Sequence, residues 1–230
     1  TNIWTQMTAD VDYDRGRPTD GRYPQKWFSF HRLGFNVGKN LNLGFFESVM
    51  TDQVDFNYFN PIVFYRWVEQ SLGTPDKVML GIDYKWNFYP SMQLYGQFAL
   101  DEFVFRGANF REMLGIIRYQ PIPKLNLTFL TMYQLYGADP DAETNWGGDV
   151  LKNRLEGSPT GLFGNVIGQG IENKVIQTNL NASYMLRHNF FIDASHTFRR
   201  RTAQDLDSPT TSQYTQLAFR WNFIRPDYNY

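Results

Sequence analysis

The chain has 230 residues, a formal net charge of −1 and no cysteine, which excludes the strongly basic surface of a nucleic-acid-binding protein, a disulfide framework and thiolate metal sites. Aromatic residues make up 17% of the sequence, a richness typical of β-strands and of membrane interfaces. No uncharged apolar run approaches the ~18–20 residues of a membrane-spanning helix, which excludes a helical membrane protein.

Alternating apolar and polar residues predict ten β-strands, each bounded by Gly, Pro, Asn or Asp. The hairpin at 78–103 shows the pattern best, and its arms of about ten residues match the ~9–11 residues that a tilted strand needs to cross a bilayer. In chain order the predicted strands cover about residues 3–13, 27–37, 41–50, 78–88, 92–102, 112–120, 125–137, 174–187, 190–200 and 212–224.

One predicted strand breaks the alternation. In 27–37, Phe28 and Phe30 fall on one face, whereas Leu33, Phe35 and Val37 fall on the other. An extra residue in a strand shifts the alternation by one position, so this pattern predicts a bulge near His31.

The connections alternate between short and long along the chain. This asymmetry is typical of outer-membrane barrels, whose short turns are periplasmic and whose long loops are extracellular. We therefore expect a single domain over residues 1–230, an all-β, antiparallel, up-and-down transmembrane β-barrel in a bacterial outer membrane. The short connections are 38–40, 89–91, 121–124 and 187–189, and the long ones are 14–26, 51–77, 103–111, 138–173 and 201–211.

Two long connections do not fit a simple meander. Residues 51–77 contain a strand-like piece and then Asn60-Pro61, an N-cap and first-turn pair that predicts a short helix over 62–72. We expect this insertion to cap the mouth of the barrel or enter its lumen. Residues 138–173 are rich in Gly, Asp, Asn and Pro, which predicts a long extracellular loop.

The polar residues of the strands are expected to share the interior face. Their default role is to form hydrogen bonds and ion pairs with one another inside a filled barrel. Carbohydrate binding is the alternative, because amides and carboxylates beside aromatic rings suit sugars. The candidate ligand-binding residues are Asp83, Lys85, Asp101 and Arg118. The expected interior set is Asp10, Asp12, Asp83, Lys85, Gln93, Gln97, Asp101, Glu112, Arg118, Gln134, Gln177, Asn179, Asn181, Asp193, Arg199 and Arg220.

A run of three arginines, Arg199, Arg200 and Arg201, lies at a predicted strand end. Such a run is suited to acidic polysaccharide or to lipopolysaccharide phosphates, and a solvated strand end is its simpler explanation.

Catalysis and cofactor binding are not expected. Of three scattered histidines, His196 falls on the lipid-facing side and His188 in a tight turn, which leaves His31 as the candidate for a hydrolase site. Asp101 and Glu102 are adjacent in a strand and so point to opposite faces, which is the wrong geometry for paired carboxylates. A loosely bound calcium ion at Asp139, Asp141 and Glu143 stays open, although no calcium-loop spacing is present.

Four blocks of sequence, at 30–49, 59–70, 78–86 and 93–103, resemble the Wzi-like capsule-assembly family, and within it the RemB-like branch associated with gliding motility. The resemblance implies an outer-membrane barrel that acts as a surface lectin for capsular polysaccharide. Members of the family are longer than this chain, so the resemblance also implies a missing N-terminal part of a larger barrel.

The sequence thus predicts a non-enzymatic protein whose partners are surface polysaccharide and outer-membrane lipid. A structural subunit of a gliding-motility or protein-secretion assembly, docking other outer-membrane proteins, is the first alternative. A passive diffusion porin is the second.

Overall fold

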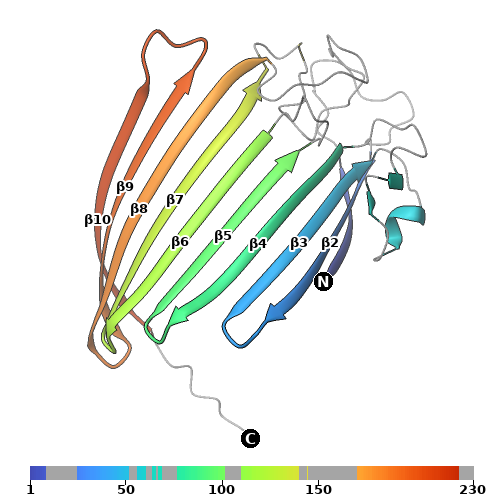
Figure 1. Cartoon of the computed structure of the whole chain (residues 1–230). Helices are drawn as coiled ribbons and strands as arrows, with labels where there is room; N and C mark the ends of the chain where they lie inside the picture. Colours follow the sequence, from blue (N-terminus) through green and yellow to red (C-terminus); the bar gives the residue numbers. More distant parts are fainter. Residues whose placement is uncertain are drawn as a thin grey trace, which may run out of the picture.

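The computed structural model describes residues 1–8, 25–51, 56–60, 64–65, 67–68, 77–101, 110–139, 144 and 170–222. They form ten antiparallel strands and a short 3-10 helix, η2 (Phe56–Phe59), and Tyr65, Trp67 and Val68 are also helical (Figure 1). Within these residues no helix is long and apolar enough to span a membrane. The strands are β1 (Asn2–Thr8), β2 (Gln25–Val37), β3 (Leu41–Thr51), β4 (Lys77–Tyr89), β5 (Met92–Asp101), β6 (Phe110–Ile122), β7 (Leu125–Ala138), β8 (Ile171–Arg187), β9 (Phe190–Ala203) and β10 (Thr210–Trp221).

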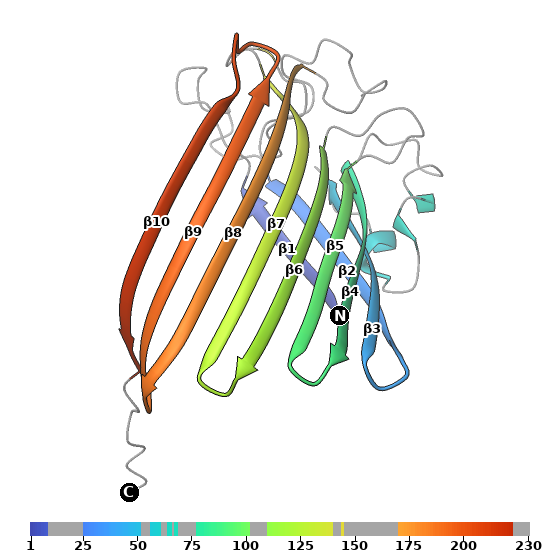
Figure 2. The same ribbon diagram turned by 60° about the vertical axis from the view of Figure 1, so that its left-hand side comes forward.

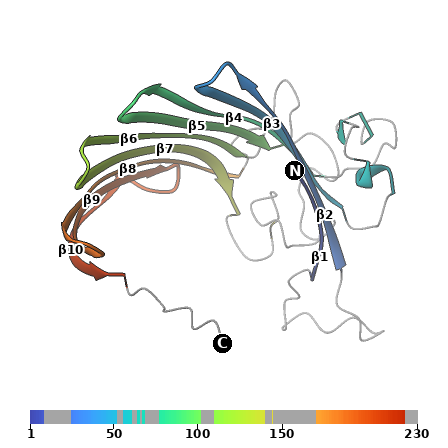
Figure 3. The same ribbon diagram turned by 90° about the horizontal axis from the view of Figure 1, so that it is seen from below.

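The strands make a single up-and-down sheet in the order β1 to β10, so each strand pairs with its neighbours in the chain. The tilted strands curve into an arch that is not closed, with β1 and β10 at its two edges (Figures 2 and 3). The ten predicted strands are therefore confirmed as an antiparallel meander. Residues 9–13, expected to continue the first strand, lie outside the described residues, and β10 ends at Trp221.

The short connections gather at one end of the sheet, which we call the turn end (Figure 1). Gly38 and Asn189 adopt positive φ values of 66° and 60° there, a backbone conformation that glycine and asparagine tolerate best. Three strand pairs shift register just before a turn, between Trp86 and Tyr89, between Tyr119 and Ile122, and between Met185 and Arg187. We call the opposite end, where β3 ends and β4 begins, the loop end.

The prediction of a bulge near His31 is wrong. β2 pairs with both β1 and β3 through His31 without a register shift. Phe28 and Phe30 instead lie on the inner face of the arch, where the Phe30 ring packs 6.0 Å from that of Phe46. The Phe46 ring in turn covers Gly81, where a Cβ atom would overlap it. The change in the sequence pattern therefore reflects a local apolar patch on the inner face.

The two faces of the arch differ in chemistry. Residues paired in register share a face, and the outer, convex face carries the apolar set of nearly every strand. Of the described in-register strand residues with exposed large hydrophobic side chains, Ile3 and Tyr214 lie on the inner, concave face. The others lie on the convex face and include Leu33, Phe45, Ile82, Met113, Ile117, Phe129, Leu180, Leu217 and Phe219.

The described part of the 51–77 insertion packs against the convex face, and Figure 3 shows η2 on the outer side of the arch. Tyr58, Tyr65 and Val68 form a buried cluster with Val49 of β3 and Val78 of β4. These residues therefore lie on the convex side of the arch, and not on the concave side that an insertion entering a barrel lumen would occupy. Most residues of the 138–173 loop lie outside the described part, so its extracellular position stays a prediction.

Candidate ligand-binding face

The concave face collects the polar strand residues. Strand register places Asp83, Gln97, Gln177 and Arg199 in one row, which crosses β6 and β7 at Leu114 and Met132. A second row holds Lys85, Tyr95 and Asn179, and it crosses the same two strands at Ile116 and Leu130. The expectation that these residues share the face opposite the apolar set is confirmed. Asp10, Asp12 and the side chain of Asp101 lie outside the described residues, and the backbone of Asp101 pairs with Met79 at the end of β5.

Asp83 is held in a bidentate ion pair with Arg32 of β2. Arg32 donates from Nε to Asp83 Oδ2 at 2.7 Å and from Nη2 to Asp83 Oδ1 at 2.5 Å, a fork geometry that is strong and directional. The same Nη2 also donates to Asn42 Oδ1 at 3.0 Å. This group spans β2, β3 and β4, so its first role is to fasten three strands together.

Two glycines make room for this ion pair. The Arg32 guanidinium lies over Gly34 and Gly44, and a Cβ atom at either position would overlap it. At Gly44 the added atom would also meet the Asp83 carboxylate. The ion pair therefore lies flat on the sheet because its neighbours lack side chains.

Lys85, two residues along β4 on the same face, has a different environment. Its Nζ lies 5.7 Å from the centre of the Tyr95 ring on β5, and Arg118 of β6 places Cζ 5.1 Å from the same ring. Arg118 Nη1 also donates to the Tyr95 hydroxyl at 3.4 Å. Lys85 and Arg118 are exposed, and neither pairs with a carboxylate among the described residues. Two charges on one half-buried ring form a cationic aromatic site, which we call the Tyr95 site.

A second ion pair lies across the arch, between β9 and β10. Arg220 donates from Nε to Asp193 Oδ2 at 2.8 Å and from Nη2 to Ser183 Oγ at 3.1 Å. Its guanidinium also lies 4.1 Å from the centre of the Phe191 ring. Like Arg32 and Asp83, this pair joins neighbouring strands, so its charges are already neutralised.

The three consecutive arginines do not form one cluster. Arg199 and Arg201 point to the concave face and Arg200 to the convex face, as alternation along a strand requires. Arg201 donates from Nε to Oδ1 of the buried Asn173 at 2.7 Å, whereas Arg199 and Arg200 are exposed. They lie on β9 toward the loop end, away from the Tyr95 site on β4 to β6.

Cations outnumber carboxylates among the described side chains of the concave face. The remaining carboxylate, Glu112, accepts a hydrogen bond from Gln134 at 2.6 Å. The cations are Lys26, Arg32, Lys85, Arg118, Arg199, Arg201 and Arg220, and the carboxylates are Asp83, Glu112 and Asp193. An anionic ligand is favoured on this face over a cationic one.

The histidines and acidic residues assemble no metal site within the described residues. His31 lies on the convex face, with Nε2 3.4 Å from Glu47 Oε2 and its ring 4.3 Å from that of Tyr65, so it belongs to the contact that holds the insertion. His196 lies on the convex face beside Thr215. The described residues contain no group of three His, Asp or Glu that could hold a metal ion. Glu102, Asp141 and Glu143 lie outside them.

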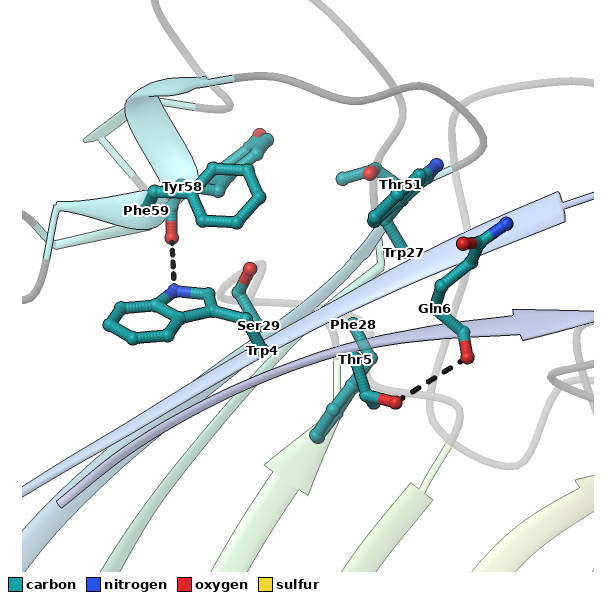
Figure 4. Close-up of a pocket in the computed structure, with 9 residues that line it drawn as sticks. All are labelled: Trp4, Thr5, Gln6, Trp27, Phe28, Ser29, Thr51, Tyr58 and Phe59. Atoms are coloured by element: carbon teal, nitrogen blue, oxygen red, sulfur yellow. Dashed lines mark hydrogen bonds between the residues drawn. The ribbon is translucent and has the colours of Figure 1, made fainter.

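A pocket of about 190 Å³ lies on the convex side, where β1 and β2 meet η2 (Figure 4). Trp4, Trp27, Tyr58 and Phe59 supply aromatic walls, and Trp4 Nε1 donates to the backbone oxygen of Tyr58 at 3.2 Å. Sequence reasoning missed this pocket, because residues 4, 27 and 58 come together through strand pairing and the fold of the insertion.

No protein-family model matches the chain, and no curated protein is similar to it in sequence.

Proposed function

We propose that this protein is part of an outer-membrane β-barrel wall that binds and positions acidic surface polysaccharide on its concave face, without catalysing a reaction. The resemblance of residues 30–103 to the Wzi-like family supports the proposal. The observation that carries it is the division of the sheet into an apolar outer face and a polar, cation-rich inner face.

The convex face supports the membrane part of the proposal. Exposed fractions reach 69% for Leu33, 67% for Leu217 and 69% for Phe219, which are high values for large apolar side chains. Such a surface in water would be an aggregation hazard, whereas lipid chains solvate it. β2 to β10 contain 10 to 17 residues each, which is sufficient for tilted strands that cross the ~30 Å hydrocarbon core.

A bilayer also places a demand on the sheet edges. Backbone N–H and C=O groups facing hydrocarbon cost several kcal/mol each when they are left without partners. The proposal therefore requires further strands against β1 and β10, so that the arch becomes a closed barrel.

The Tyr95 site supports the choice of ligand. Lys85 and Arg118 carry charges that the described residues leave unneutralised, and a uronic-acid carboxylate supplies the missing partner. The Tyr95 ring offers an apolar surface for a sugar ring. Asp83 and Arg220, by contrast, are occupied by their own ion pairs.

The test compares variants of the full-length protein for binding to alginate, an acidic polymer, and to dextran, a neutral one. The double variant Lys85→Gln with Arg118→Gln should lose about tenfold or more in alginate affinity, because each charge-assisted hydrogen bond contributes roughly 1.5–3 kcal/mol. Arg200→Gln, on the convex face, is the matched control and should bind as the unaltered protein does. Equal binding by all three proteins would contradict the ligand assignment, as would a preference for dextran.

A passive diffusion porin is the second candidate, and the position of the insertion favours it. The described residues of the insertion pack outside the arch, so they do not block the lumen. Stepwise conductance of the full-length protein in planar bilayers, reduced by neither alginate nor the Lys85 and Arg118 changes, would favour the porin.

A further inference from the structure

The described residues of the insertion are fixed firmly to the convex face. Tyr65 is fully buried and its backbone N–H donates to Glu47 Oε2 at 2.8 Å. Burial, reinforced by the Glu47 carboxylate, raises the pKa of the Tyr65 phenol to about 12, so the side chain stays neutral. Trp4 binds the neighbouring Tyr58 backbone. The insertion is thus held to β1 and β3 by polar contacts as well as by its apolar cluster.

The other side of the same segment exposes large aromatic rings. The exposed fractions are 84% for Phe56, 57% for Phe64 and 69% for Trp67, and Phe59 is 37% exposed. The ring centres of Phe56 and Phe59 lie 6.0 Å apart, and those of Phe64 and Trp67 lie 5.5 Å apart, so the four rings form two contacting pairs. A segment that buries one side and exposes aromatic rings on the other has a second apolar surface to cover.

The position of these rings indicates what covers them. Directly toward the turn end, the same strands present the paired residues Phe45 and Ile82, both exposed on the convex face. The apolar surface therefore continues from the sheet onto the insertion. Exposed apolar side chains of the sheet and of a segment packed on it are expected to meet a single apolar environment.

The spacing to the aromatic residues at the turn end supports the same conclusion. Trp86 and Phe88 of β4 are exposed there, with ring centres 5.3 Å apart. Ten residues separate Phe88 from Val78, on which the insertion sits, and this is about 33 Å along the strand. At a tilt of about 40° the separation along the barrel axis is about 25 Å, which is the height of the apolar band between the two aromatic girdles of an outer-membrane barrel.

We propose that the insertion is an interfacial anchor, whose rings at Phe56, Phe64 and Trp67 lie at the boundary between headgroups and acyl chains of the lipid leaflet at the loop end. The inference rests on the proposed membrane barrel. It gives the segment expected to plug the lumen an external role, which is to set the depth of the wall in the membrane. Aromatic side chains are enriched at this boundary because their apolar rings tolerate both sides of it.

The absence of cysteine from the chain allows a direct test. Single variants Phe64→Cys and Trp67→Cys of the full-length protein carry a polarity-sensitive fluorophore, and the proteins are reconstituted in pure phosphatidylcholine vesicles. Brominated lipids then report the depth of each label. Phe129→Cys, on the convex face of β7, is the lipid-facing reference, and Tyr214→Cys, on the concave face with 59% exposure, is the matched aromatic control.

The expected result is strong quenching at 64 and 67 by lipids brominated near the headgroups, deeper quenching at 129, and none at 214. Quenching at 129 without quenching at 64 and 67 would overturn the anchor and leave the barrel standing. Shielding of 64 and 67 that needs added outer-membrane proteins would also overturn it, in favour of a protein partner. No quenching at 129 would show that the membrane barrel itself has failed, and the anchor with it.

Discussion

Asp83 and Lys85 lie two residues apart on β4 and face the same side of the sheet, but they are in opposite electrostatic situations. Asp83 is clamped by Arg32 over Gly34 and Gly44, whereas the exposed Lys85 shares the half-buried Tyr95 ring with Arg118. The comparison separates two uses of charge on one face. A charge that has a partner holds strands together, and a charge that lacks one is available to a ligand.

The largest expected effect comes from breaking the ion pair. Asp83→Ala leaves Arg32 partly buried without its carboxylate, and we expect a loss of about 2 kcal/mol in the free energy of unfolding, less than the ~3–5 kcal/mol of a fully buried pair. Lys85→Ala should change that free energy little. Urea unfolding in detergent micelles measures both. Equal effects at 83 and 85 would remove the distinction between the two residues.

Gly44→Ala tests the room that Gly34 and Gly44 leave for the ion pair while keeping both charges. The added Cβ overlaps Arg32 and Asp83, and overpacking of this kind costs about 1–2 kcal/mol. Gly115→Ala is a close control, because a Cβ there meets a methyl group of Thr131 at an ordinary 3.5 Å. The same unfolding measurement should separate the two variants, and matching values would mean that the guanidinium moves aside at no cost.

Salt should weaken ligand binding and leave the stability of the sheet around its ion pairs nearly unchanged. Raising ionic strength from 0.1 to 1 M shortens the screening length from about 10 to about 3 Å. We therefore expect alginate affinity to fall about tenfold over this range, a change of about 1.4 kcal/mol. Lys85→Gln should lower the slope of affinity against salt. A slope that Lys85→Gln leaves unaltered would place the ligand elsewhere on the face.

The smallest effect concerns the ring itself. Tyr95→Leu removes the surface under Lys85 and Arg118 and should cost about 0.5–1 kcal/mol in alginate affinity, the range of an exposed cation–π contact. Tyr95→Phe keeps the ring and loses a long hydrogen bond from Arg118, so it should bind nearly as the unaltered protein does. Calorimetric titration resolves the two. A larger loss for the Phe variant than for the Leu variant would assign the binding to the hydroxyl.

Much of the sheet was predictable, because a period of two residues fixes both the strands and the face of each residue. Alternation alone placed Lys85, Arg118 and Gln177 together on the face opposite the apolar set, and their register confirms that they share it. Partners were not predictable in the same way. Arg32 lies 51 residues before Asp83, and their pairing depends on the register of three strands.

Two errors share a cause, since each depends on contacts between distant segments. The parity change at Phe28 and Phe30 indicated a bulge, whereas tertiary packing against Phe46 explains it. The insertion was expected to cap the barrel mouth or enter the lumen, whereas its described residues lie on the convex face; its own sequence contains no information about which face of the sheet it would cover. Glu47 and Trp4, which hold it outside, belong to other strands.

The strand order from β1 to β10 has a kinetic consequence. Every strand pairs with its predecessor, and four of the hairpins close through tight turns, so the entropy lost in bringing partners together is small for those four pairs. Hairpins form in about 1–10 μs. We expect such a sheet to assemble one hairpin at a time, because each new strand can pair with the edge strand that precedes it in the chain. Adding or removing a whole hairpin from such a sheet would leave the pairing of the other strands unchanged.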